Sequence, residues 1–371
     1  MIKDGMLSAI WVAKKSVPYR FWIRQATHRE YIMELKPVIG VLLGDATGVG
    51  PELVARVAAS GFLHAHCRPL IIGDERVFKQ GMEIAKVNVP YTVVEDVDQA
   101  EWKKAIPLLD QKNLNPEIDY QIGQISEKSG AAVLAMIEQA ARLFVENKIH
   151  GFVFAPFNKE AMKKAGCPFE SEHHLLAHIF GHTGPFGEIN VVGNLWTTRT
   201  TSHIPIKDVS ANLTVDRIYK AIVLADTSLK HAGIKRPRLG LAALNPHAGE
   251  HGLCGREELD VINPAIAVAK QAGIEASGPY PSDILFIKAF NGDFDGVVTM
   301  YHDQGQIALK LKGFDEGITI AGGLPAPIAT CAHGTAYDIA GKGVVRTKAF
   351  ENAVAMTSRM ASHLMGSGGL A

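Results

Sequence analysis

Three histidines follow three separate apolar segments, each at the point where a strand is expected to end. His203 lies in TSH at 201–203, His247 in NPHAGE at 245–250, and His302 in YHDQG at 301–305. In open α/β sheets, ligands gather at the carboxyl ends of strands, so we expect these imidazoles on one rim. A single histidine is more often a surface or core residue. Three on one rim favour a catalytic divalent ion such as Zn²⁺, with an open coordination position.

Acidic residues near these histidines could support such a site. Asp303 follows His302 directly, and Asp283 closes the segment PYPSD at 279–283. Carboxylates of this kind orient metal-bound imidazoles or accept protons from a substrate. Either role is open to both residues.

A glycine-rich segment, HGTAYDIAGKG at 333–343, could bind a nucleotide. Glycines allow tight turns and a close backbone approach to a ligand, while Thr335 or Asp338 can hydrogen-bond a ribose or a base. A plain loop with a helix cap is the alternative interpretation. Because no GxGxxG follows a strand, an ordinary Rossmann cofactor site is not supported.

From residue 37 onward, short apolar runs alternate with amphipathic stretches. The strands are expected at 38–43, 69–72, 91–94, 152–155, 189–192 with a continuation to 196, 239–244, 296–300 and 318–320. The helices are expected at 51–62, 130–147, 215–232, 257–272 and 349–363. This alternation predicts an α/β fold with a largely parallel sheet. No long linker separates the segments, so two domains would be interwoven.

Composition excludes several classes of protein. Lys plus Arg and Asp plus Glu both total 38, so no nucleic-acid or membrane partner is indicated. The four cysteines are scattered without a CxxC pair, which favours reduced thiols in a cytoplasmic protein. No apolar run approaches the roughly 20 residues of a transmembrane helix.

The first 36 residues differ in composition from the rest of the chain. Their basic residues outnumber the acidic ones, and Met33 stands just before the first expected strand. They lack the long apolar core and small-residue cleavage site of a secretory signal. A start codon assigned too far upstream is the simplest explanation, and an adapted interaction arm is the second.

The glycine-rich segment resembles the cofactor loop of the isocitrate/isopropylmalate dehydrogenase superfamily. Four further motifs are GDATGVGPE at 44–52, APFNKE at 155–160, NPHAGE at 245–250 and YHDQG at 301–305. In this order they resemble the 4-hydroxythreonine-4-phosphate dehydrogenase family. The similarity runs from about residue 37 to the C-terminus.

The resemblance implies two interwoven α/β/α domains of the isocitrate/isopropylmalate dehydrogenase-like type, with a cleft between them. Residues 37–165 plus 312–371 would form the cofactor-side domain, and 166–311 the metal and dimerisation domain. Residues 1–36 would be an extra segment. The family further implies a homodimer with active sites at its interface.

The resemblance also assigns roles to individual residues. A divalent metal (Zn, or Mg, Mn or Co) would be held by His203, His247 and His302, the residues that the strand-end argument selects. NAD or NADP would be bound by His333, Gly334, Thr335, Asp338 and Gly341. The family's substrate-binding lysine falls on Lys310.

The chain departs from the family at four other substrate-binding positions. Glu172 stands where the family has His, His173 where it has Thr, Thr319 where it has Asn, and Ile328 where it has Arg. These changes favour an unphosphorylated, carboxylated diol as substrate. The alternative is a phosphorylated four-carbon acid (4-hydroxythreonine 4-phosphate, threonate phosphate or erythronate phosphate), with donors from His173, His174 or Arg256.

The expected chemistry is oxidation of a secondary alcohol on a small hydroxy acid, followed by decarboxylation. A metal-bound alcohol has a lowered pKa, so a modest base can remove its proton as hydride leaves to the nicotinamide. Asp303, Asp283 and Lys159 are the candidates for proton handling, without an order among them. A metal-dependent hydrolase would have no need of the 333–343 loop, and a non-catalytic binding homologue would be free to lose its histidines.

Overall fold

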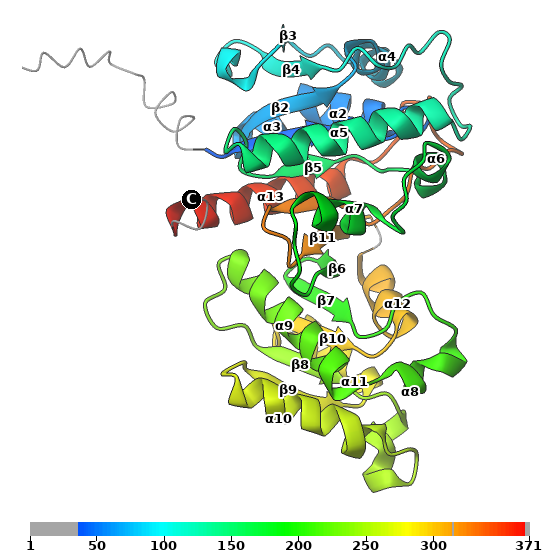
Figure 1. The fold of residues 1–371 in the computed structure, drawn as a ribbon, viewed down its shortest axis with the longest axis vertical. Helices are drawn as coiled ribbons and strands as arrows, with labels where there is room; N and C mark the ends of the chain where they lie inside the picture. The colour runs from blue at the N-terminus through cyan, green and yellow to red at the C-terminus, as the bar shows by residue number, and fades with distance from the viewer. Residues whose placement is uncertain (1–35, 314, 368–371) are drawn as a thin grey trace, which may run out of the picture. The chain divides into compact units, whose positions relative to one another are not determined.

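Twelve strands form one sheet in the computed structural model, which describes residues 36–313 and 315–367. Their order is β3-β4-β2-β1-β5-β12-β11-β6-β7-β10-β8-β9 (Figure 1). The strands are β1 Val38–Leu42, β2 Arg68–Gly73, β3 Tyr91–Val94, β4 Ile106–Asp110, β5 Phe152–Phe154, β6 Gly187–Val192, β7 Leu195–Arg199, β8 Leu239–Ala242, β9 Ala276–Tyr280, β10 Gly296–Thr299, β11 Ile318–Gly322 and β12 Ile328–Cys331. Most pairs are parallel; the antiparallel ones are β11–β12, β11–β6 and β6–β7. The predicted α/β class is confirmed.

Helices connect most of these strands. The α-helices are α2 Gly50–Ala59, α3 Phe62–His66, α4 Glu75–Ala85, α5 Glu127–Val145, α6 Lys159–Lys164, α7 Glu172–Ile179, α8 Val209–Asn212, α9 Val215–His231, α10 Asn263–Gln271, α11 Ser282–Phe290, α12 His302–Gly313 and α13 Lys348–Gly366. The shorter helical segments are η1 Val97–Gln99, η2 Ile206–Asp208, η3 Pro246–Gly252 and η4 Glu258–Ile262.

Local sequence explains why the longer helices form where they do. Helix α5 begins after Ser126, whose side chain accepts a hydrogen bond from the Ser129 N–H, a standard N-cap. Its buried residues recur at three- and four-residue spacing, so one face is apolar. That face packs on β1 and β2, while α13 packs on β5, β11 and β12, and α9 on β7, β8 and β10 (Figure 1).

Three observed strands do not appear among the expected ones: β4, β9 and β12. Pro107 lies in β4, and Gly278 and Pro279 lie in β9, and both residue types weaken a strand pattern. The expected continuation from 189 to 196 is wrong. Gly193, with φ of 59°, and Asn194 make a turn there, so β6 and β7 form a hairpin.

The part of the chain that begins at Lys36 forms one compact unit. Strands from the predicted cofactor-side domain occupy one end of the sheet order, and strands from 166–311 occupy the other. The division into two domains remains a prediction. The expectations for residues 1–36 concern a segment that lies, apart from Lys36, outside the described residues. Among the described helices, none has the length and apolar character that crossing a membrane requires.

Gly130 lets α5 approach α6, the helix that carries Lys159. A Cβ added to Gly130 would lie 2.1 Å from the backbone oxygen of Ala161. Real Cβ atoms do not approach backbone so closely, so any larger residue must push the two helices apart.

We expect Gly130→Ala to destabilise the protein by about 1–3 kcal/mol, although alanine is the better helix former by roughly 1 kcal/mol. Urea unfolding would measure the change. Gly366 in α13, where an added Cβ meets no atom within 4 Å, provides the control. Equal stability for Gly130→Ala and Gly366→Ala would refute this account of the packing.

Candidate functional site

Three neighbouring strands carry the candidate metal ligands to one edge of the sheet. Strand β10 pairs in parallel with β7 on one side and with β8 on the other. Parallel strands end at the same edge, so the segments that follow β7, β10 and β8 begin side by side. These segments contain His203, His302 and His247 respectively.

His203 and His302 lie close together. Their ring centroids are 5.6 Å apart. The Nδ1 of His302 is 2.7 Å from the Asp303 Oδ1, a contact that orients the ring and leaves Nε2 free. Desolvation, followed by the charge of Arg199, holds the pKa of His203 below its ordinary value. Both features suit neutral imidazoles that bind a metal.

His247 is not brought into a metal-binding group with the other two. In the described part of the chain, no group of three or more His, Cys, Asp or Glu side chains is placed to hold a metal ion. His247 is exposed and begins a run of six residues with positive φ, from 53° at His247 to 100° at Gly252. Non-glycine residues adopt this conformation at a cost, and such strain concentrates at functional sites.

A buried carboxylate holds this strained turn in place. The Glu258 Oε1 accepts hydrogen bonds from the backbone N–H groups of Leu244 and Asn245, each at 2.8 Å. The Asn245 side chain donates to Glu257 and Glu258. The chain that leads to His247 is therefore fixed before the turn begins.

A cavity of about 710 Å³ lies beside His203. Seven of the predicted site residues line it: Lys159, Glu172, His173, His203, Thr319, His333 and Gly334. Lys159 lies on α6, Glu172 and His173 on α7, and Thr319 on β11. His203 lies in the segment after β7, and His333 and Gly334 lie in the segment after β12. The fold thus brings a metal-ligand candidate, substrate-binding candidates and part of the cofactor loop to one cavity.

The cavity wall carries more negative than positive side chains. Its carboxylates are Glu170, Glu172 and Glu188, and its lysine and arginine side chains are Lys159 and Arg217. The Lys159 Nζ is 3.9 Å from the Glu172 Oε2, an oxygen that is buried and has no hydrogen-bond partner in the described structure. A buried carboxylate oxygen without a hydrogen-bond donor is energetically unfavourable, and the hydroxyl group of a bound ligand would supply that donor.

Burial dominates the state of the histidine next to Glu172. Desolvation lowers the pKa of His173, although the neighbouring carboxylates of Glu172 and Glu188 oppose the shift. The His173 Nδ1 is 3.8 Å from Glu172, beyond hydrogen-bond range. A neutral imidazole in the wall can donate to or accept from a ligand.

Other predicted residues lie outside this lining. Ile328 is fully buried in β12, and Lys310 lines a separate cavity of about 30 Å³. Asp283 is exposed at the start of α11, where its side chain accepts from the Ile284 N–H. Asp303 touches His302 and does not line the cavity.

The 333–343 loop, the candidate cofactor loop, packs against the loop at 44–50. Gly48 allows close contact, since an added Cβ would lie 2.7 Å from the Thr335 backbone oxygen, and the Val49 N–H donates to that oxygen at 3.0 Å. The Tyr337 hydroxyl donates to the Asp45 Oδ2 at 2.9 Å. Two further predicted residues, Asp338 and Gly341, are exposed on the same loop.

Asp45 is the buried centre of this contact. Its Oδ1 accepts from the Thr47 N–H, the Thr47 hydroxyl and the Ser129 hydroxyl, the last at 2.6 Å. Burial raises the pKa of Tyr337 to about 12, so its hydroxyl stays a donor. Two motifs far apart in the sequence are thereby joined through one carboxylate.

Sequence reasoning missed a polar network beneath the cavity. Arg199 of β7 donates to Asn190 and Glu188 of β6, and Asn190 also contacts Gln306 and Thr319. Burial raises the pKa of Glu188, but Arg199 and Asn190 more than compensate, and its pKa lies below the ordinary value. The sequence contains the signal, because Glu188 and Asn190 alternate with Ile189 and Val191, which places the two polar side chains on one face of the strand.

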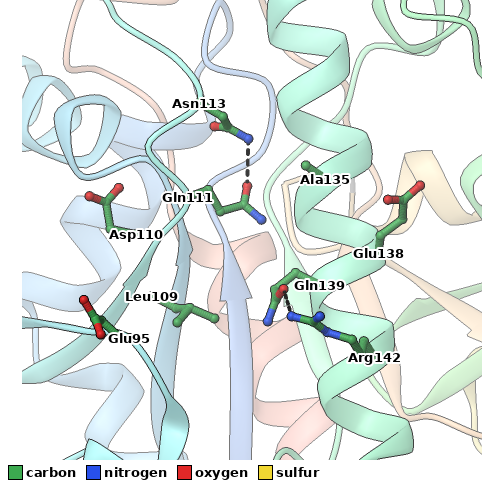
Figure 2. A pocket seen from close by; sticks show the side chains of 9 residues that line it. All are labelled: Glu95, Leu109, Asp110, Gln111, Asn113, Ala135, Glu138, Gln139 and Arg142. Carbon is green, nitrogen blue, oxygen red and sulfur yellow. Dashed lines mark hydrogen bonds between the residues drawn. The ribbon is translucent and has the colours of Figure 1, made fainter.

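A second cavity, of about 560 Å³, lies between the end of β4 and α5 (Figure 2). It contains none of the predicted site residues. Figure 2 shows two polar pairs bonded within it, Asn113 to Gln111 and Arg142 to Gln139. It shares no lining residue with the larger cavity.

We expect Tyr337→Phe to loosen the cofactor loop and to destabilise the protein by about 1.5–3 kcal/mol, the usual effect of losing a hydrogen bond to a charged group. Urea unfolding and limited proteolysis of residues 333–343 would measure both effects. Tyr91→Phe is the matched control, because Tyr91 donates to Glu75 at 2.8 Å, away from this loop. Equal cleavage of the loop in both variants would contradict the assignment.

Comparison with known proteins agrees with the motifs. The family model described as "Pyridoxal phosphate biosynthetic protein PdxA" matches residues 65–357. The 4-hydroxythreonine-4-phosphate dehydrogenase of Geobacter metallireducens is 38% identical over 339 residues, covering 90% of this chain and 98% of that protein. The D-threonate 4-phosphate dehydrogenase of Cupriavidus necator is 35% identical over 327 residues, covering 88% and 98%.

Solved structures extend the similarity to the fold. The crystal structure of 4-hydroxythreonine-4-phosphate dehydrogenase from Klebsiella pneumoniae has a TM-score of 0.80 and 31% identity, covering 88% of this chain and 98% of that one. That of a terephthalate 1,2-cis-dihydrodiol dehydrogenase from Burkholderia xenovorans LB400 has a TM-score of 0.61 and 26% identity, covering 87% and 98%. The family model covers well over half of the sequence, and the relatives align along nearly their whole length. The chain therefore belongs to the pyridoxal phosphate biosynthetic protein PdxA family.

Proposed function

We propose that this protein is an NAD(P)-dependent and divalent-metal-dependent dehydrogenase. It oxidises a secondary alcohol on a small hydroxy acid, with decarboxylation of the product. The observation that carries the proposal is the pairing of His203 with His302, 5.6 Å apart, beside a cavity that also contains part of the 333–343 loop. The relatives are named as dehydrogenases, which favours this class over a hydrolase or a non-catalytic binding protein.

The donor set fits a divalent metal in part. His203 has the environment of a neutral ligand, and His302 is oriented by Asp303. His247 of the same chain does not join them. Its strained, exposed turn suits a ligand that is presented to a second copy of the chain, so the proposed functional unit is a homodimer in which each metal has ligands from both subunits.

The residues around the cavity have different roles in the proposed reaction. A bound divalent cation would polarise the substrate's alcohol oxygen, and the nicotinamide would accept the hydride. Lys159 is the proton-handling candidate that lines the cavity, whereas Asp303 acts by orienting His302. Glu172 and His173 are placed to hold substrate hydroxyl groups.

The substrate proposed is an unphosphorylated, carboxylated diol. A phosphate monoester carries close to two negative charges and is usually met by Arg forks and lysines. The lining of the larger cavity has three carboxylates but only one lysine and one arginine, Lys159 and Arg217. Lys310 lines a different cavity. The dihydrodiol dehydrogenase with a similar fold acts, by its name, on a substrate of the proposed kind.

A phosphorylated four-carbon acid is the second candidate. The names of the two sequence relatives favour it, since both specify a 4-phosphate. Of the donors considered for such a phosphate, His173 and His174 line the cavity. Arg256 does not, and its guanidinium is already paired with Asp260 at 2.9 and 3.0 Å.

The metal site leads to a prediction about mixed dimers. Chelation should abolish turnover, and His247→Ala and His302→Ala should each lose metal and activity. Mixed dimers of the two inactive variants should regain activity, because one of the two sites then has all three histidines. Zinc content and dehydrogenase assays after subunit mixing would measure this.

His251→Ala is the control, because His251 lies in the same turn without a predicted ligand role. It should keep metal and activity. Failure of the mixed dimers to regain activity would exclude ligands from two subunits, and full activity in metal-free protein would exclude metal dependence.

Asp338 leads to a prediction about the cofactor. Its exposed side chain on the 333–343 loop is proposed to contact the adenosine of NAD. Asp338→Ala should weaken cofactor binding about tenfold, equal to about 1.4 kcal/mol, while metal content stays unchanged. Calorimetric titration with NAD and NADP would measure the affinities, and an unchanged affinity for both would remove Asp338 from the site.

The charge of the cavity leads to a prediction about substrate preference. Each missing charged hydrogen bond costs about 1.5–3 kcal/mol, so kcat/KM for a 4-phosphorylated hydroxy acid should be orders of magnitude below that for the best diol acid. Glu172→His should narrow this difference by removing a negative charge. If the native protein prefers the phosphorylated acid to every unphosphorylated diol acid tested, this interpretation of the cavity is wrong.

A further inference from the structure

We propose that Arg199 is a positioning residue that sets the relative placement of His203 and His302 through a network centred on Asn190. The proposal rests on the proposed function, because the metal site is what gives the histidine pair its role. The network on which it depends consists of hydrogen bonds between side chains of this chain.

Arg199 is held from three directions at the end of β7. Its side chain is only 7% exposed. The Nε donates to the Ser202 hydroxyl at 2.9 Å, Nη1 donates to the Asn190 Oδ1 at 2.9 Å, and Nη2 donates to the Glu188 carboxylate. Hydrogen bonds from a buried guanidinium are strong and directional. The bond from Nε fixes Ser202, the residue directly before His203.

Asn190 extends the same network to the helix that begins with His302. Its Oδ1 also accepts from the Gln306 Nε2 at 2.5 Å. Gln306 lies four residues after His302 on α12, and residues at this spacing share one helix face. Arg199, four residues before His203, and Gln306, four residues after His302, therefore donate to the same amide oxygen.

The remaining bonds fix Asn190 itself. Its Nδ2 donates to the Thr319 hydroxyl at 3.0 Å and to the Glu188 carboxylate at 3.1 Å. The amide is thereby oriented with its oxygen toward Arg199 and Gln306. A shift of Arg199 would disturb both histidine segments, because its side chain bonds directly to Ser202 and shares the Asn190 Oδ1 with Gln306.

A purely structural ion pair would behave differently. A buried ion pair contributes little net stability. Removal of one partner nevertheless lowers the stability of the whole fold, because the other charge is left buried and unpaired. A positioning role predicts that the geometry of the histidine pair and the metal affinity change beyond what stability loss explains. Outer-shell partners of metal ligands typically alter metal affinity by about 10- to 100-fold.

The test compares Arg199→Met with Ser202→Ala in the full-length protein. Ser202→Ala removes the link to the His203 segment and leaves the other Arg199 bonds in place. Arg238→Met is the matched control, because Arg238 forms a two-oxygen pair with Asp295 without contacting either histidine segment. Melting temperatures would be recorded for each variant.

Two measurements separate the proposal from the proposed function. The first is the nuclear Overhauser effect between the rings of His203 and His302 in metal-free protein with labelled histidines. The second is the Zn²⁺ affinity by calorimetry. We expect Arg199→Met to lose the ring-to-ring signal and to bind Zn²⁺ about 10- to 100-fold more weakly. Ser202→Ala should show a smaller change of the same kind, and Arg238→Met none.

Each outcome decides the question. If Arg199→Met does not fold, Ser202→Ala and Gln306→Met, which removes the α12 link, give the same readouts. Retention of the ring-to-ring signal and of Zn²⁺ affinity within about twofold in all folded variants overturns the proposal. If native protein binds no Zn²⁺ while Arg199→Met still loses the ring-to-ring signal, the positioning role stands and the proposed metal function fails.

Discussion

Parallel pairing of β10 with both β7 and β8 is the constraint on which the candidate site depends. Hydrogen bonds between parallel strands fix their direction, so the three segments that carry histidines must leave the sheet at one edge. Neighbouring strands lie about 4.8 Å apart, so the segments after β7 and β10 begin close together. The ring centroids of His203 and His302 are 5.6 Å apart. Without the parallel register of β7 and β10, the segments that carry His203 and His302 would not begin side by side.

A second long-range link holds the other wall of the site. Asp45 is fully buried and accepts hydrogen bonds from four groups, one of which is the Tyr337 hydroxyl. A buried carboxylate without such donors would be costly, so the 44–50 loop and the 333–343 loop stabilise each other. The 333–343 loop keeps its shape because it is bonded to the segment that connects β1 to α2.

The lining of the larger cavity has three carboxylates, one lysine and one arginine. Glu172 and Glu188 contribute acceptors to the wall, and Arg199, which is paired with Glu188, donates to protein partners from Nε, Nη1 and Nη2. The arginine thus supports the architecture of the site and leaves the wall short of free positive charge. The proposed diol substrate would donate hydrogen bonds from its hydroxyl groups to these acceptors.

Sequence alone determined the α/β class, most of the strands and the family, because buried strands require continuous apolar runs and the motifs are local. It also selected His203, His302, Glu172 and His173 as site candidates. What it did not contain is the direction of each side chain and the partner it meets.

The tertiary structure decided those points. Ile328, aligned with a substrate-binding position, is fully buried in β12, and His247 stays apart from the other two histidines of its own chain. Asn190 bonds to Thr319 across a separation of 129 residues. Side chains alternate between the faces of a strand, so a one-residue change of register reverses their direction. Only the assembled sheet fixes that register, and with it which residues share the cavity.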